Sequence, residues 1–223
     1  MFNALFYKEW IKTRRIVLLI GLIFAGIIVY SFIHTAQSFR VGGPVQVWAD
    51  IILKDAPVLP PFIQWLPVMT ALLLGFTQFV PEMSNKKLKL SLHLPLSETR
   101  IVTSMLCYGL LVLTASYVVT YVVIMTGLSH YFPTEIRMAA LWKSLPWFIA
   151  GLAAYPLAVW ICIEPVWRQK IFNALITLCI LALFFITAPS GAYLPVMPVL
   201  LIVAVICFGL PFFSTARFKE GKQ

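Results

Sequence analysis

Residues 16–33 read IVLLIGLIFAGIIVYSFI, an apolar run without a single charged residue. A helix needs roughly 20 residues to cross a hydrocarbon core about 30 Å thick, and slightly fewer at the lower limit. Similar runs follow at residues 58–80, 101–126, 144–163, 171–188 and 193–213. Because lipid offers no partner for an unpaired backbone N–H or C=O, each run is predicted to be helical. The predicted fold class is all-α, a polytopic membrane protein with six transmembrane helices.

The composition supports this class. Of the 223 residues, 61% are hydrophobic and only 11% are charged, too few to form the polar shell of a soluble fold of this size. The net charge of +9 could suggest nucleic acid, but the basic residues lie in short clusters between apolar runs. We therefore expect no nucleic-acid partner, and we expect residues 1–223 to form a single transmembrane domain.

The distribution of Lys and Arg predicts the orientation, because cationic side chains are retained on the cytoplasmic side. One set of alternate connections carries four basic residues: Arg40, Lys54, Arg137 and Lys143. The termini and the other connections carry thirteen: Lys8, Lys12, Arg14, Arg15, Lys86, Lys87, Lys89, Arg100, Arg168, Lys170, Arg217, Lys219 and Lys222. Both termini are therefore predicted to be cytoplasmic, as an even number of spans also requires.

The N-terminal segment FNALFYKEWIKTRR predicts an interfacial helix. Lys8, Lys12 and Arg15 recur at helical spacing and form a basic row, and Trp10 is suited to the headgroup level. We expect this row to face anionic lipid on the inner membrane surface. The alternative is a simple charged cap on the first span, and neither reading is catalytic.

The connection PEMSNKKLKLSLHLPLSETR, residues 81–100, is longer than two neighbouring spans require. Acidic and capping residues near its start and Pro95 near its end favour a short cytoplasmic helix over about residues 82–93. The alternation of polar and apolar residues in its middle favours a strand locally. A single strand would leave its backbone groups unpaired, so the helix is preferred.

Two outer connections also carry signals. Residues 34–57 contain VQVWADIILKD between Gly42-Gly43-Pro44 and Pro57, which predicts a short interfacial helix with Trp48 at the headgroup boundary. Residues 188–198, APSGAYLPVMP, are uncharged and broken by three prolines. They favour either a re-entrant hairpin packed against protein or an ordinary tight turn.

Charged residues and histidines all lie outside the predicted spans or at their margins. Ion-driven carriers usually keep an ionisable group at membrane depth, so this distribution argues against that class. Enzyme motifs such as G-x-S-x-G are not found, and no metal site is predicted, since His34 and His130 have no cluster of further ligands. The polar residues at depth serve either helix packing or a substrate path; they are Gln64, Gln78, Thr114, Thr120 and Asn173.

The order of these parts resembles an ABC-2 type permease, the membrane subunit of an ATP-binding-cassette exporter. The resemblance covers the layout of the whole chain, and its motif lies in EMSNKKLKLSLHLPLSETRIV, residues 82–102. The matching positions are Glu82, Leu94, Pro95, Leu96, Ser97, Ile101 and Val102. The chain departs from the family pattern where Ser84-Asn85-Lys86-Lys87 replaces a common Gly-Thr, and it has no lysine near Ser104.

The resemblance implies a coupling helix that docks into a separately encoded cytoplasmic ATPase, which would bind the ATP and Mg²⁺; this chain itself would hold no cofactor. A second permease copy, identical or similar, would complete a pathway through the bacterial cytoplasmic (inner) membrane for a lipid-like, peptide or other amphipathic substrate. The implied docking residues are Glu82, Met83, Ser84, Asn85, Lys86, Lys87, Leu90 and Leu94.

Two other classes compete with this hypothesis. One is a membrane-embedded lipid-modifying enzyme that uses Glu82, His93 and Glu98, although these residues lack a recognisable catalytic spacing. The other is a non-transporting scaffold or immunity protein that only recruits partners.

Overall fold

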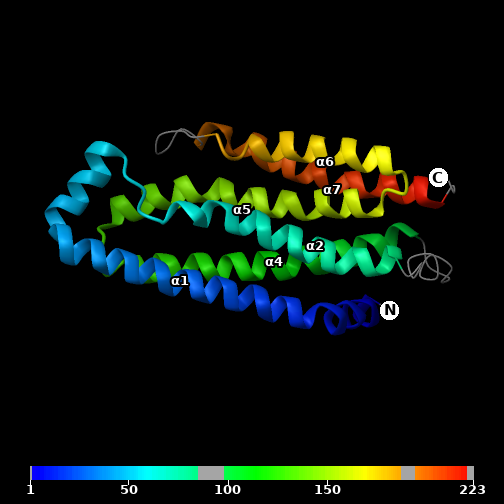
Figure 1. Ribbon diagram of the computed structural model, residues 1–223, viewed down its shortest axis with the longest axis horizontal. Coiled ribbons are helices and arrows are strands. Elements are labelled where there is room, and N and C mark those ends of the chain that lie inside the picture. Colours follow the sequence, from blue (N-terminus) through cyan, green and yellow to red (C-terminus); the bar gives the residue numbers. More distant parts are fainter. Residues whose placement is uncertain (1, 85–97, 187–193, 220–223) are drawn as a thin grey trace.

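The computed structural model describes residues 2–84, 98–186 and 194–219. Every secondary-structure element in these ranges is helical, which confirms the predicted all-α class. Figure 1 shows an elongated bundle whose long helices run side by side, with both termini at the same end. The elements are α1 (Phe2–Lys54), η1 (Pro61–Trp65), α2 (Leu66–Ser84), α4 (Glu98–Leu128), α5 (Thr134–Ile163), α6 (Trp167–Ala182), η2 (Leu194–Val196) and α7 (Met197–Lys219).

Five stretches of these helices are long and apolar enough to cross a membrane, which indicates a membrane protein. They are Leu5–Lys54, Pro61–Met83, Thr99–Leu128, Thr134–Ile163 and Leu194–Arg217. The predicted span at residues 171–188 corresponds to α6, which has only 16 residues and ends at Ala182. This helix starts earlier than predicted, at Trp167. The predicted span was begun after Lys170 because only uncharged residues were counted, whereas the first turn of α6 contains both Arg168 and Lys170.

The first span predicted, residues 16–33, is too short. The helix continues without a break to Gly43, whose φ of 70° and ψ of 160° interrupt it before Pro44. Thr35 and Ser38 donate to the carbonyl oxygens of Ser31 and His34 at 2.9 and 3.0 Å, so the polar residues continue the helix. The predicted span ended where the polar residues His34 and Thr35 follow the apolar run, and α1 continues past them.

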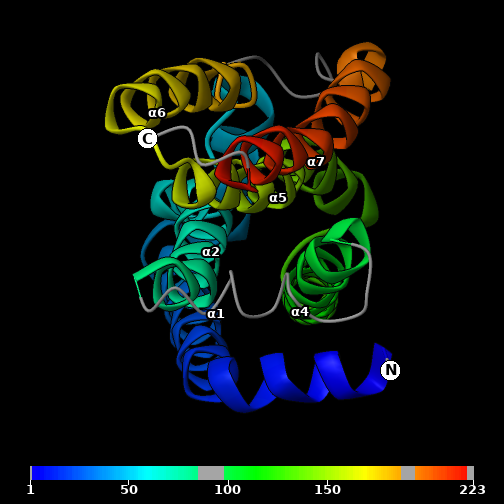
Figure 2. The same cartoon turned by 90° about the vertical axis from the view of Figure 1, so that its right-hand side faces the viewer.

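The two ends of α1 cross the two ends of the bundle. After Gly43, the turns Pro44–Lys54 fold across the end opposite the termini (Figure 1), and they include the short helix predicted around Trp48. Figure 2 shows the first turns of α1 running across the other end, while the rest of α1 and α4 are seen nearly end-on. The N-terminal turns therefore lie against several helices at once.

Helix α5 is the core of the bundle. It contacts α2, α4, α6 and α7, and 78% of its most apolar stretch is buried inside the bundle, against 17% for α1. Small residues allow this close packing: a Cβ added at Gly75 of α2 would lie 2.9 Å from the Cβ of Ala158. The core is thus built on α5, and the outer helices leave apolar faces that lipid would cover.

Candidate functional site

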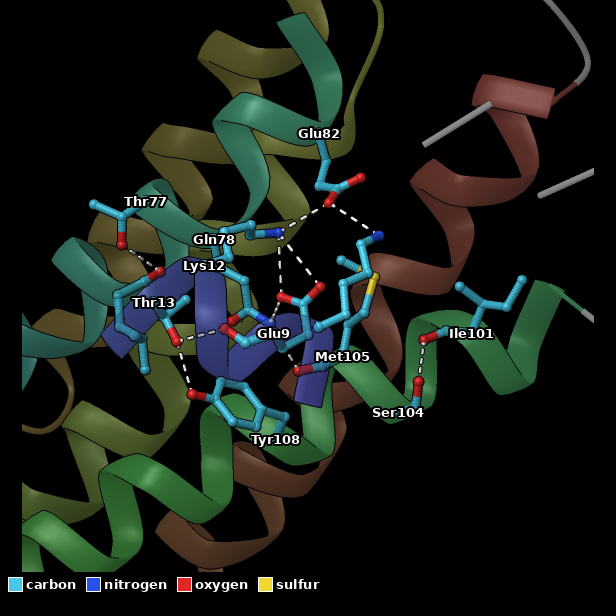
Figure 3. Close-up of polar contacts among 12 residues, drawn as sticks. Glu9, Lys12, Thr13, Thr77, Gln78, Glu82, Ile101, Ser104, Met105 and Tyr108 are labelled. Atoms are coloured by element: carbon cyan, nitrogen blue, oxygen red, sulfur yellow. Dashed lines mark hydrogen bonds and ion pairs between the residues drawn. The ribbon is translucent and has the colours of Figure 1, made fainter. Parts of the chain in front are cut away.

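A cluster of charged and polar side chains, drawn in Figure 3, lies near the N-terminus, at the end of the bundle that carries both termini in Figure 1. It draws on four helices: Glu9, Lys12 and Thr13 from α1, Gln78 and Glu82 from α2, Met105 and Tyr108 from α4, and Tyr155 from α5. We call these residues, together with Lys8, the terminal-end network.

Two buried carboxylates are paired with two ammonium groups in this network, and one of the ammonium groups contacts both carboxylates. The Lys12 ammonium lies 3.0 Å from Oε1 of Glu82 and 3.1 Å from Oε2 of Glu9, and the Lys8 ammonium lies 3.3 Å from the same Glu82 oxygen. Glu9 and Glu82 are each only 2% exposed. Isolated charges at such burial would be very costly, so their mutual compensation is what makes this arrangement stable.

Gln78 connects the charged pair to the helix core. Its amide nitrogen donates to Oε2 of Glu9 at 2.9 Å and to the Met105 carbonyl at 3.0 Å. Its amide oxygen accepts from the Tyr155 hydroxyl at 2.6 Å. Gln78 and Tyr155 are fully buried, and direct hydrogen bonds extend the network from α1 through α2 to α4 and α5.

Close approach of the backbone makes this geometry possible. A Cβ at Gly109 of α4 would overlap the hydroxyl and ring of Tyr155, so only glycine leaves room for that side chain to reach Gln78. On the other side, the hydroxyls of Thr13 and Tyr108 are hydrogen-bonded at 2.7 Å. Helical spacing places the members on common faces, since Glu9 precedes Thr13, and Gln78 precedes Glu82, by one turn.

Two expectations about these residues need correction. Lys8 and Lys12 were predicted to face anionic lipid, but both turn toward Glu82, while Trp10 and Arg15 remain exposed. The opposite charge on α2 is the reason, because a buried carboxylate attracts both ammonium groups more strongly than a screened surface does.

Glu82 was predicted to begin a separate cytoplasmic helix and to contact an ATPase. It lies in the last turn of α2 instead, and its carboxylate is buried against α1. Pro81 does not end α2, which continues to Ser84. Met83, also expected to contact the ATPase, is half-buried and packs against the core of the bundle. The side chain of Ser84 is not described, and the remaining expected docking residues lie outside the described residues: Asn85, Lys86, Lys87, Leu90 and Leu94.

The five residues proposed for a substrate path lie in different surroundings. Gln64 borders a pocket of about 570 Å³ at the end opposite the termini, and Gln78 belongs to the network. Thr114 is exposed, and Thr120 is buried with its hydroxyl bonded to the Ser116 carbonyl. Asn173 is 1% exposed, and its amide has no hydrogen-bond partner among the described residues. They do not form one path within this chain.

Sequence reasoning missed Glu9 and Tyr155. Glu9 is the only acidic residue before Asp50, yet it stands in a basic segment that was interpreted through its positive charges. Tyr155 is a lone hydroxyl in the apolar stretch IAGLAAYPLAV of α5. In both cases a single residue of unusual character within its surroundings was the available signal.

Comparisons with protein-family models, with curated proteins and with solved structures give no match to this chain. The resemblance to ABC-2 permeases therefore stays a prediction from the sequence.

Proposed function

We propose that this chain is the membrane-spanning subunit of an ABC transporter of the ABC-2 permease type, an exporter driven by a separate cytoplasmic ATPase. The observation that carries the proposal is the terminal-end network. It joins the N-terminal turns of α1 to Glu82, the first residue of the stretch 82–102 whose sequence resembles that of the ABC-2 family. The bundle of apolar helices supports the membrane part of the proposal.

In this proposal the network transmits force between the ATPase and the bundle. An ATPase that moves residues 85–97 would pull on the last turn of α2. Because Lys8 and Lys12 hold Glu82, the N-terminal turns of α1 would move with it. Gln78, one turn earlier, would pass the motion to α4 and α5 through Met105 and Tyr155. Glu82 would thus act inside the bundle, and the residues after it would contact the partner.

The proposal also covers the wider assembly. Two permease copies would enclose a pathway in the cytoplasmic membrane, with both termini on the ATPase side. The polar residues at depth are few, and the outer helix faces are apolar, which favours an amphipathic substrate over a small ion. ATP and Mg²⁺ would bind the ATPase.

Isolation of the tagged chain from its native membranes in mild detergent tests this function. We expect Mg²⁺-dependent ATP hydrolysis to co-purify with the wild-type chain and to be absent from the chain after separation from its partners. The double variant Lys86→Glu, Lys87→Glu should lose the co-purifying ATPase, whereas the control Lys54→Glu, at the other end of the bundle, should retain it. ATP hydrolysis by the isolated chain, or equal retention in both variants, would contradict the proposal.

A further inference from the structure

A second buried carboxylate lies where α5 meets α6. Glu164 follows the last residue of α5 and precedes Pro165, which disfavours a helical conformation for the residue before it. Glu164 is completely buried, and its Oε2 atom accepts a hydrogen bond from Ser214 of α7 and lies 3.7 Å from Nη1 of Arg217. These contacts fix the carboxylate against α7.

The other oxygen of Glu164 has no hydrogen-bond partner within the part of the chain that the structure describes. Its Oε1 atom is buried and makes no hydrogen bond with any described residue. Almost all buried polar atoms in proteins are hydrogen-bonded, and an unpaired carboxylate oxygen is an especially costly exception. This atom therefore requires a donor that the described chain does not supply.

Glu164 borders a pocket of about 710 Å³, a volume typical of small-ligand sites. One wall is an apolar face of α2, formed by Phe76, Val80 and Met83 at helical spacing. The rim carries Lys170, for which no carboxylate partner is found in the described residues. The α5–α6 turn lies at the end of the bundle that carries both termini (Figure 1).

These features define the chemistry of an occupant. An apolar wall on a membrane helix suits an acyl chain. Among the described residues, the carboxylate oxygen lacks a hydrogen-bond donor, which suits an ammonium group, and the lysine lacks a carboxylate, which suits a phosphate. Trp167 at the rim is 73% exposed, and indole rings favour the headgroup level of a bilayer. The order from apolar wall to charged rim matches the order from chain to head group in a membrane lipid.

We propose that this pocket binds a phospholipid whose head group carries a primary ammonium group, with the ammonium at Glu164, the phosphate at Lys170 and an acyl chain against α2. The ligand is an intact lipid from the bilayer rather than its free head group, because most of the residues that line the pocket are apolar. The proposal concerns lipid binding alone and does not depend on the transport function.

Native mass spectrometry of the purified full chain, titrated with short-chain phospholipids, tests the proposal. The probes are dioctanoyl phosphatidylethanolamine and dioctanoyl phosphatidylcholine, which share chain and phosphate but differ in whether the cation can donate hydrogen bonds. One charge-assisted hydrogen bond corresponds to about tenfold in affinity. We expect the wild-type chain to bind the ethanolamine lipid tighter than the choline lipid by about that factor.

Two variants separate the two head-group contacts. Glu164→Gln should reduce the preference for ethanolamine, because the ethanolamine lipid loses a charge-assisted hydrogen bond whereas the choline lipid loses only the weaker charge attraction. Lys170→Met should weaken both lipids and keep their ratio, so it tests the pocket even if the Glu164 variant does not fold. The matched control Arg168→Gln changes a neighbouring exposed cation that does not border the pocket, and it should alter neither affinity.

Equal affinity of the wild-type chain for the two lipids would overturn the proposal, as would a loss in Arg168→Gln as large as in Lys170→Met. Competition by free phosphoethanolamine at the same concentration would show that the head group alone is the ligand, and it would overturn the assignment to a bilayer lipid.

Discussion

The two ends of the bundle use the same kinds of charged residue in opposite ways. At the end that carries the termini, Glu9 and Glu82 are 2% exposed and are bound by two lysines and a buried amide. At the other end, the ion pairs Lys143–Asp55 and Lys54–Asp50 have short nitrogen–oxygen distances of 3.0 and 2.7 Å, but their side chains are 29% to 75% exposed to solvent. Distance alone therefore does not measure how strongly a pair holds helices together.

Burial is the physical difference between the ends. An exposed ion pair adds little to the free energy of unfolding, because water screens the charges and the long side chains lose conformational entropy when they pair. A buried pair is costly to form, but removing one member leaves an uncompensated charge, which is more costly still. The terminal end thus joins helices through contacts that are costly to remove, whereas the opposite end tolerates change.

The largest expected effect comes from neutralising one carboxylate at each end. Glu82→Gln should lower the free energy of unfolding by about 3 kcal/mol, because Lys8 and Lys12 lose their shared partner in a buried site. Asp55→Asn, the matched change at the opposite end, should cost less than about 1 kcal/mol. SDS titration in mixed micelles, followed by far-UV circular dichroism, measures both. Similar losses in the two variants would refute the comparison.

An intermediate effect is expected from Gly109→Ala, which fills the space of the Tyr155 side chain. The added methyl group must displace this hydroxyl from Gln78, and such overpacking typically costs about 2 kcal/mol. Gly21→Ala is the control, since nothing lies within 4 Å of a Cβ at that position. Unfolding in SDS measures both variants.

A double-mutant cycle identifies the cause of the Gly109 effect. In a Tyr155→Phe background the hydroxyl is absent, so Gly109→Ala should cost less than in the wild-type chain. An identical cost in both backgrounds would mean that the clash does not act through the hydroxyl that binds Gln78.

The sequence predicted the helices of the bundle but not their arrangement. The apolar runs predicted helices because length and lack of charge are decisive in lipid, and those helices are present. Which helix lies at the centre could not be predicted, since α5 and α7 are both apolar all round and no periodicity separates a buried face from a lipid-facing one. Small residues such as Ala154 and Ala158 in α5 were the one available hint.

The candidate site was predicted only in part, for a related reason. Gln78 and Glu82 were singled out, but as members of two different sites, and Glu9 was not singled out at all. Charges were interpreted as signals of topology, an interpretation that treats each connection separately. A buried ion pair between Lys12 and Glu82 joins residues 70 positions apart, and nothing in either local pattern indicates that pairing.

The smallest expected effect distinguishes the two lysines of the network. Lys12 contacts both carboxylates and its side chain is 21% exposed, whereas Lys8 contacts only Glu82 and is 44% exposed. Lys8→Met should therefore cost less than about 1 kcal/mol, as expected of a pair at the solvated rim, and Lys143→Met at the opposite end should cost a similar amount. Lys12→Met should exceed both in the same SDS titration, because Glu9 and Glu82 would then be left to repel each other. If Lys8→Met proved as costly as Lys12→Met, the boundary between the buried and solvated parts of the network would lie further out than the exposure of Lys8 indicates.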